Sequence, residues 1–397
     1  MTSTHTENDA TSLPAGNEPK KRAKFNTLTV SSVEKLTDDA VEVSFAVPEE
    51  LRDDYNYVPG QYVALRAMID GEEVRRSYSI CAAPTDGTIR VGIKRDFGGK
   101  FSTWANESLQ PGDTIDVMNP QGAFTSKIRM TGLNDAQEVK KDLRDVQNPR
   151  IAAIAAGSGI TPIMAITDTV LAGVPDAQVE LVYSNRGGGD VMFADRIGDL
   201  KDKHPTRFAV HNVLTREQRI NPLLSGRIDA EKLTTLLDQV IGVETIDEWF
   251  LCGPFELVQL CRDELEKRDV DPSKIRFELF TTGDPKKAAG GNAGRPVVAD
   301  PKGENINIEF QLDGLSGEVL SPASAQETIL NAALRVRSDV PFACAGGVCG
   351  TCRAKVVEGD CKMDENYALE PDEVQAGYIL TCQTRPTSKS IKVDFDA

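Results

Sequence analysis

The stretch CAGGVCGTC, residues 344–352, places Cys344, Cys349 and Cys352 in the spacing C-x4-C-x2-C. A fourth cysteine, Cys382, follows in the segment YILTCQ. Cysteines this close together are found in zinc sites, redox-active dithiols, iron–sulfur loops and structural loops that hold no metal. The spacing and the residues between the cysteines distinguish these alternatives.

The spacing favours a [2Fe–2S] cluster held by four thiolates. A zinc site usually pairs two C-x2-C knuckles, and a thioredoxin-like dithiol needs C-x-x-C at a helix start, so neither explains all four cysteines. The plant-type [2Fe–2S] pattern does explain them. The glycines at 346, 347 and 350 let the backbone wrap closely and donate N–H groups to the sulfurs. We predict that these four cysteines are the metal ligands and that Cys361 is an incidental thiol.

Composition and charge narrow the function classes. Of the 397 residues, 40% are hydrophobic and 27% are charged, which is ordinary for a globular protein. A net charge of −16 argues against nucleic acid as a partner and is compatible with a basic protein partner. The three histidines are too few to favour a His-rich metal site or a Ser-His-Asp triad. No apolar run reaches the ~20 residues that a membrane span needs, and no secretory leader is apparent, so we expect a cytoplasmic protein without a membrane partner.

The pattern of apolar, polar and turn-forming residues changes several times along the chain, which predicts three domains. Short alternating strands separated by Gly, Pro and Asp turns predict an antiparallel β-barrel, and apolar strands alternating with helices predict a parallel α/β sheet. A hairpin, a helix over SAQETILNAALRVR and the cysteine loop predict an α+β domain of β-grasp type. The predicted segments are a disordered tail (1–24), the barrel (25–130), a polar insertion (131–149), the α/β domain (150–283), a linker (284–302) and the α+β domain (303–397).

Four motifs in the barrel region resemble those of the ferredoxin–NADP reductase family: YVPGQYV (57–63), RRSYSI (75–80), VGIKR (91–95) and GGKFST (98–103). The resemblance implies a flavin site. In it Arg76 neutralises a flavin phosphate, Tyr78 stacks beside the isoalloxazine ring, and Ser79 lies near N5, where hydride arrives. GGKFST is expected to begin a helix that cradles a pyrophosphate, which favours FAD and leaves FMN open. The implied flavin-binding residues are Arg76, Ser77, Tyr78, Ser79, Ile93, Lys94, Gly99, Lys100, Phe101 and Ser102.

Two further motifs, AAGSGITP (155–162) and CGP (252–254), resemble the nicotinamide-binding turns of the same family. A glycine-rich turn between strand and helix lets backbone N–H groups approach a phosphate. The residues implied for nicotinamide binding are Gly157, Ser158, Gly159, Thr161, Arg186, Arg216, Cys252, Gly253 and Pro254. The residues implied in catalysis are Ser79, Cys252 and Glu278.

The preferred nicotinamide coenzyme depends on two arginines. Arg186 follows the second strand of the α/β domain, where enzymes that prefer NAD often carry an acid, and Arg216 follows the next strand in LTREQ. Two arginines suit the 2′-phosphate of NADPH. Asp190 lies close in sequence, and it keeps NADH open as the alternative.

The order of the three domains resembles reductase components of multicomponent oxygenases over nearly the whole chain. The segment MDENYALEPDEVQAGYILTCQTRP (363–386) and the ending VDFDA (393–397) resemble, within them, the reductase subunits of phenylacetyl-CoA epoxidases. The resemblance implies that electrons pass from NADPH to FAD, to the [2Fe–2S] cluster, and then to the separate di-iron oxygenase subunits that epoxidise phenylacetyl-CoA. The alternatives are the reductase of a ring-hydroxylating dioxygenase or another mono-oxygenase, a flavin and iron–sulfur redox sensor, and a zinc-binding scaffold.

An acidic segment separates the last two predicted cluster ligands. It contains Asp364, Glu365, Glu370, Asp372 and Glu373. Such a segment is either a docking face for an oxygenase or simply a solvated surface, and the sequence does not favour one over the other.

Overall fold

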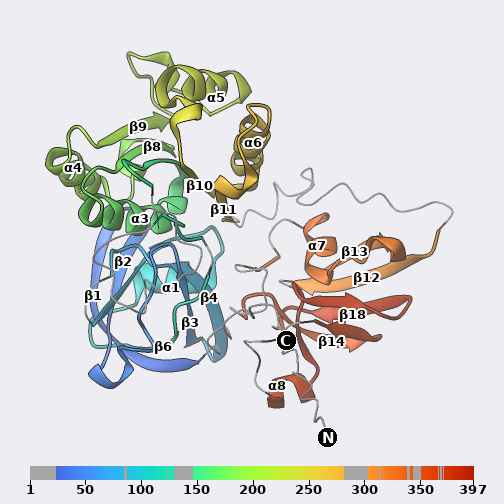
Figure 1. The fold of residues 1–397 in the computed structure, drawn as a ribbon. Coiled ribbons are helices and arrows are strands. Elements are labelled where there is room, and N and C mark those ends of the chain that lie inside the picture. Colours follow the sequence, from blue (N-terminus) through green and yellow to red (C-terminus); the bar gives the residue numbers. More distant parts are fainter. Residues whose placement is uncertain are drawn as a thin grey trace, which may run out of the picture.

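The computed structural model describes residues 24–84, 87–122, 124–128, 146–280, 303–312, 314–337, 340–342, 350–364, 366, 369 and 371–397. These residues form three domains, coloured in sequence order in Figure 1. Several predicted features lie outside the described residues: nearly all of the tail, most of the insertion, the linker, Cys344, Cys349, Glu365 and Glu370.

The first domain is an antiparallel barrel, as predicted. Its strands are β1 (Phe25–Thr37), β2 (Ala40–Ala46), β3 (Tyr62–Ile69), β4 (Glu72–Ser79), β5 (Thr88–Lys94) and β6 (Thr114–Met118). They follow the order β4-β3-β6-β1-β2-β5, and a bridge between Ile80 and Val91 joins the two ends of the sheet. Helix α1 (Lys100–Glu107) packs Phe101 and Ala105 into the same apolar core as the strands.

The second domain is the predicted parallel sheet. Its strands are β7 (Arg150–Ala156), β8 (Gln178–Asn185), β9 (Phe208–Leu214), β10 (Glu248–Gly253) and β11 (Ile275–Leu279), in the order β11-β10-β7-β8-β9. Its helices are α3 (Ile160–Gly173), α4 (Ala194–Lys203), α5 (Ala230–Leu236) and α6 (Phe255–Glu266). Alternate residues of β7 enter two different cores: Ala153 packs with α3, and Ile154 packs with α5 and α6. Both faces of the sheet are therefore covered, which explains the continuous apolar strands.

The third domain has a mixed sheet in the order β13-β12-β18-β14-β16 and a small β15-β17 pair. Its strands are β12 (Asn305–Leu312), β13 (Leu315–Pro322), β14 (Arg353–Glu358), β15 (Cys361–Met363), β16 (Tyr378–Leu380), β17 (Thr384–Pro386) and β18 (Ser390–Asp394). Its helices are α7 (Ile329–Leu334) and α8 (Pro371–Gln375).

Helix α7 is shorter than the sequence predicts. The prediction covered SAQETILNAALRVR, but Gln326 has a left-handed backbone with φ of 50°, which a helix cannot continue through. Thr328 then caps the helix, because its side chain accepts a hydrogen bond from the backbone N–H of Asn331. Local turn and cap chemistry therefore moves the start of the helix to Ile329.

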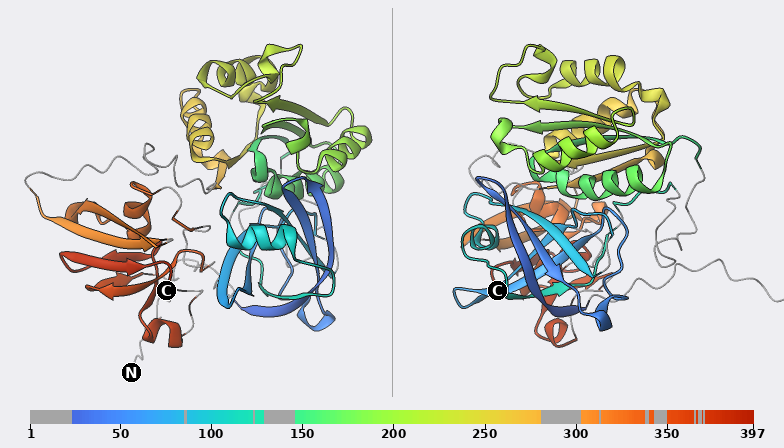
Figure 2. Two further views of the ribbon diagram at one scale, coloured as in Figure 1. Left: turned by 180° about the vertical axis from the view of Figure 1, so that it is seen from behind. Right: turned by 90° about the vertical axis from the view of Figure 1, so that its left-hand side faces the viewer.

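The domains contact one another through the barrel. Figures 1 and 2 show the α/β domain at one end of the barrel and the third domain beside it, on the side of β4. One apolar cluster joins Ala40 and Phe124 of the barrel region to Ile163 and Phe250 of the α/β domain. Within the described ranges, no helix is long and apolar enough to cross a membrane.

Candidate functional site

Strand β4 and helix α1 form the candidate flavin site. The ring of Tyr78 lies 5.6 Å from that of Phe101, centroid to centroid, which ties the β4 motif to the start of the helix. Successive side chains of a strand point to opposite faces, so Arg76 and Tyr78 share one face of β4. The side chain of Ile93 is buried in the barrel core and its carbonyl accepts a hydrogen bond from Asn106, and its predicted contact with flavin stays a prediction.

The start of helix α1 suits the phosphate groups of a flavin nucleotide. Gly99 is its N-cap and no side chain caps the helix, and an uncapped helix start of this kind suits an anion. A Cβ on Gly99 would lie 2.5 Å from Ser102 Oγ, so a larger residue here would displace the hydroxyl that accepts a hydrogen bond from the Asp96 N–H. Asp96 lies beside this turn. Burial raises the pKa of Asp96 to about 6, although Arg76 and Lys94 act to lower it.

Ser79, Glu278 and Cys252 meet where the barrel adjoins the α/β domain. The hydroxyl of Ser79 donates a hydrogen bond of 3.2 Å to Glu278 Oε2. Glu278 is the register partner of Cys252 across the parallel β10-β11 pair. Burial, and then the nearby Glu278, raise the pKa of the Cys252 thiol well above its ordinary value, so the group stays neutral. The three residues predicted to act in catalysis are therefore brought to one place.

The two nicotinamide turns pack backbone against backbone. The turn Gly157–Gly159 connects β7 to α3, and a Cβ on Gly159 would lie 2.3 Å from the carbonyl oxygen of Cys252. Tyr183 donates a hydrogen bond to the Gly157 carbonyl, and Thr161 donates one to that of Ser158. Glycine at 159 is thus required by the close approach of the two turns, which lie at the carboxyl ends of β7 and β10. That edge of a parallel sheet is where nucleotides bind.

The two predicted phosphate-binding arginines differ in their surroundings. Arg186 lies 2.7 Å from Asp39 of the barrel and 2.5 Å from Asp190, so its guanidinium is paired with two carboxylates. Lys94, predicted to bind flavin, also pairs with Asp39, at 2.9 Å. Arg216 lies next to Arg186, with its backbone N–H donating to the Arg186 carbonyl, and its side chain is exposed.

Asp39 was not singled out from the sequence, although it joins two predicted sites. Burial acts to raise the pKa of Asp39, but hydrogen bonds from Lys94, Thr37 and Arg186 lower it below the ordinary value. The aspartate lies on the turn between β1 and β2, where an isolated acidic residue carries no recognisable pattern.

Two of the four predicted cluster ligands are within the described residues, and they lie close together. Cys352 and Cys382 are both buried in the core of the third domain. The backbone N–H and the hydroxyl of Thr381 both donate to the carbonyl of Cys352, at 3.1 and 2.9 Å. Gly350 has a φ of 72°, which permits a tight turn just before Cys352. This arrangement fits a cluster loop, and thiolates are the ligands that such clusters take.

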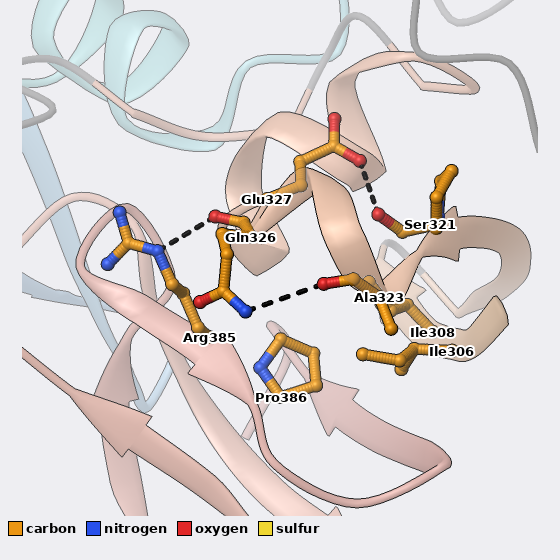
Figure 3. A pocket seen from close by; sticks show the side chains of 9 residues that line it. Ile306, Ile308, Ser321, Ala323, Gln326, Glu327, Arg385 and Pro386 are labelled. Atoms are coloured by element: carbon orange, nitrogen blue, oxygen red, sulfur yellow. Dashed lines mark hydrogen bonds between the residues drawn. The ribbon is translucent and has the colours of Figure 1, made fainter. Parts of the chain in front are cut away.

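A small pocket, shown in Figure 3, lies beside the segment that follows Cys382, and polar residues line part of it. Arg385 donates to the carbonyl of Gln326 at 2.8 Å, and Ser321 donates to Glu327 at 2.7 Å. Arg335 pairs with Glu327 at 2.9 Å. The Arg385 hydrogen bond ties strand β17, which follows Cys382, to the turn before α7, and the Ser321–Glu327–Arg335 contacts hold the start of α7 against β13.

Comparisons with known proteins agree with this geometry. Three family descriptions match: "Oxidoreductase FAD-binding domain" over residues 27–126, "Oxidoreductase NAD-binding domain" over 153–263 and "2Fe-2S iron-sulfur cluster binding domain" over 313–387. One component of the 1,2-phenylacetyl-CoA epoxidase from Escherichia coli is 41% identical over 94% of this chain and 98% of that protein. The chain belongs to the ferredoxin–NADP reductase family, in the branch that ends in a plant-type ferredoxin domain.

Two further proteins match over nearly the full length of both chains. The ferredoxin reductase component of 3-ketosteroid-9-alpha-monooxygenase from Rhodococcus rhodochrous is 32% identical, over 93% of this chain and 96% of that protein. The solved structure of phthalate dioxygenase reductase, described as modular for electron transfer from pyridine nucleotides to [2Fe–2S], matches with a TM-score of 0.52. It covers 94% of this chain and 98% of that structure, at 20% identity, and it supports the fold alone.

The chain is therefore an oxidoreductase of the electron-transfer type that uses FAD, NAD(P)H and a [2Fe–2S] cluster. This confirms the predicted FAD, [2Fe–2S] cluster and nicotinamide coenzyme, and the choice of NADPH stays a prediction. The individual contacts of Arg76, Tyr78, Arg216 and the other motif residues with these cofactors remain predictions.

Proposed function

We propose that this protein is the reductase component of a phenylacetyl-CoA epoxidase and delivers electrons from NADPH to the di-iron oxygenase subunits of that complex. The observation that carries the proposal is the 41% identity with a component of the Escherichia coli epoxidase, which extends over nearly the full length of both chains. It includes the ferredoxin-type domain, the part that hands electrons to a partner.

The residues of the chain have distinct tasks in this function. Arg76 and the start of α1 hold the flavin phosphates, Tyr78 flanks the ring, and the glycine turn at 157–159 holds the nicotinamide coenzyme. The Ser79–Glu278 hydrogen bond joins the barrel to the α/β domain between the two sites. It keeps the carboxyl group of Glu278 beside the flavin motif. When bound, the flavin accepts electrons in a pair and releases them singly, which a one-electron cluster requires.

NADPH is proposed over NADH because Arg216 is exposed at the carboxyl end of β9, beside Arg186, where a 2′-phosphate suits a guanidinium. The pairing of Arg186 with Asp39 and Asp190 leaves Arg216 as the main determinant. We expect kcat/KM with NADPH to exceed that with NADH. A higher kcat/KM with NADH would reassign the coenzyme and leave the electron chain intact.

The proposal is tested by mixing the purified holoprotein with the oxygenase subunits of a phenylacetyl-CoA epoxidase. NADPH oxidation and product are followed with and without phenylacetyl-CoA. We expect phenylacetyl-CoA to stimulate oxidation and ring epoxide to appear. If NADPH reduces the protein but no epoxide forms with an oxygenase that is active with its own reductase, the partner assignment is wrong.

A second candidate is the reductase of a different mono-oxygenase. It is favoured by the 32% identity with the reductase component of the 3-ketosteroid enzyme, which covers almost the same length. The same experiment with the oxygenase component of that system separates the two candidates.

A further inference from the structure

Strand β4 has a second face, opposite to the one that carries Arg76 and Tyr78. Since side chains alternate along a strand, Arg75 and Ser77 point opposite to Arg76 and Tyr78. Figure 1 shows that β4 is the part of the barrel nearest the third domain. The motif therefore has Arg76 and Tyr78 on one side of the strand and Arg75 and Ser77 on the other. Ser77 was predicted to bind flavin, and its contact with the third domain is a second interaction of the same motif.

Two contacts join this second face to the ferredoxin-type domain. The hydroxyls of Ser77 and Thr351 lie 2.7 Å apart, and Thr351 immediately precedes the predicted ligand Cys352. The guanidinium of Arg75 lies 3.3 Å from Glu373 Oε1. The side chains of this pair are only 12% and 16% exposed, so water screens their attraction less than it does at the surface.

Glu373 also pairs with an arginine of its own domain. Arg353 Nε lies 3.2 Å from the same carboxylate oxygen, and the Arg353 guanidinium stacks on the ring of Tyr378 at 3.7 Å. One carboxylate thus bridges two guanidiniums that belong to different domains.

We propose that Arg75, Ser77, Thr351 and Glu373 form an internal docking contact that positions the cluster loop against the flavin-binding strand for electron transfer. All four are positioning residues. The rate of electron transfer falls steeply with distance, and what the protein contributes is the placement of the two cofactors. The contact links residue 77, in the middle of the flavin motif, to residue 351, one position before a cluster ligand.

This contact changes how part of the acidic segment between Cys352 and Cys382 is interpreted. Glu373 was predicted to face an oxygenase or solvent, but its carboxylate faces Arg75 and Arg353. Asp364 is likewise paired, with Arg385. The proposal rests on the electron chain of the family and not on the identity of the oxygenase, so its test needs no oxygenase.

The test uses charge reversal in the holoprotein. Arg75→Glu and Glu373→Arg are compared singly and together by anaerobic stopped-flow spectroscopy, which separates flavin reduction by NADPH from cluster reduction. We expect each single variant to slow cluster reduction by at least about tenfold, since like charges then meet in a contact that water screens only weakly. Flavin reduction should stay within about twofold of the wild type.

The exchanged pair provides the rescue. Arg75→Glu combined with Glu373→Arg again places one carboxylate with two guanidiniums, so we expect at least about half of the lost cluster-reduction rate to return. Lys24→Glu, in the exposed Lys24–Asp54 pair of the same barrel, is the matched control and should leave both steps unchanged. Wild-type cluster reduction in the single variants, or no recovery in the exchanged pair, would overturn the proposal.

A second measurement does not depend on the cofactors. Ser77→Cys combined with Thr351→Cys places two thiols where the hydroxyls lie 2.7 Å apart. We expect a 77–351 disulfide on mild oxidation of the apoprotein, identified by peptide mass mapping. Its absence, with both thiols modified by iodoacetamide instead, would show that the domains do not dock in this way.

Discussion

Cys382 and Cys361 lie in the same domain and differ in how they are placed. Cys382 is buried beside Thr381, which bonds to Cys352, whereas Cys361 is partly exposed in β15. We expect Cys382→Ser to remove the cluster, because a neutral hydroxyl replaces a thiolate ligand, and Cys361→Ser to retain it.

Iron and acid-labile sulfide, at about two each per chain in the wild type, measure the outcome of these cysteine variants. Loss of iron in Cys361→Ser with full iron in Cys382→Ser would reverse the ligand assignment. Zinc in place of iron in the wild-type protein would contradict the cluster itself.

We expect the affinity of the protein for FAD to depend on pH because of Asp96. Its pKa of about 6 means that the carboxyl is mostly protonated at pH 5 and mostly ionised at pH 7. The ionised form competes for Arg76 and repels the flavin phosphates. Affinity for FAD should therefore fall by roughly fivefold as pH rises from 5 to 7, a loss of about 1 kcal/mol.

Asp96→Asn removes this titration, so we expect its FAD affinity, measured by fluorescence quenching, to be flat over the same range. Glu107→Gln, which alters an exposed acid on helix α1, is the control and should keep the wild-type slope. An unchanged slope in Asp96→Asn would assign the pH dependence to another group.

Among the elements, the turn between β7 and α3 is the most sensitive to a small change. A Cβ on Gly159 would lie 2.3 Å from the Cys252 carbonyl oxygen and 2.9 Å from the Gly253 N, both backbone atoms that cannot rotate away. We expect Gly159→Ala to separate the two nicotinamide turns, to raise KM for NADPH at least about tenfold, and to destabilise the domain by about 1–3 kcal/mol.

Gly198→Ala in helix α4 is the matched substitution, because nothing lies within 4 Å of the position that its Cβ would take. It should leave KM unchanged and stabilise the helix by about 0.5–1 kcal/mol. Steady-state kinetics and thermal melting distinguish the two variants. Equal effects of both would mean that close packing of the turns is not the cause.

The elements themselves were largely predictable, because their signals are local. The apolar β7 strand, the glycine turn and the start of α1 at Gly99 all follow from residues within a few positions of one another. Helix α7 shows the limit: its apolar pattern extends beyond its real start, and the left-handed Gln326 that decides the boundary has no strong sequence signature.

At the scale of the whole molecule, the sequence identified the domains but not their contacts. Ser77 meets Thr351 across 274 positions, and Asp39 meets Arg186 across 147. A single serine or aspartate carries no sign of such a partner, since the pairing depends on how separately folded domains dock. For this reason the family motifs revealed the cofactor sites, whereas the residues that couple those sites appeared only in three dimensions.

A buried charge network between the barrel and the α/β domain supports the last prediction. Arg196 of α4 pairs with Asp168 of α3 and lies 3.7 Å from Glu42 of β2, whose side chain is almost fully buried. Burial raises the pKa of Asp168, and Arg196 acts to lower it. Arg196→Met should destabilise the protein by about 2–3 kcal/mol, less than for a fully buried pair because Arg196 is partly exposed.

The loss caused by Arg196→Met should be larger at pH 7 than at pH 4, close to the ordinary aspartate pKa of 3.8. Without the guanidinium the pKa of Asp168 rises further in the folded state, while the unfolded state keeps its ordinary value. Asp168 then loses its proton at a lower pH in the unfolded state than in the folded state. The free energy of unfolding therefore falls as the pH rises towards the folded-state pKa. Thermal melting followed by flavin release measures this, with the exposed Arg219→Met as control. Equal losses at both pH values, or recovery of none of the loss by adding Asp168→Asn, would show that Arg196 acts through packing rather than through its charge.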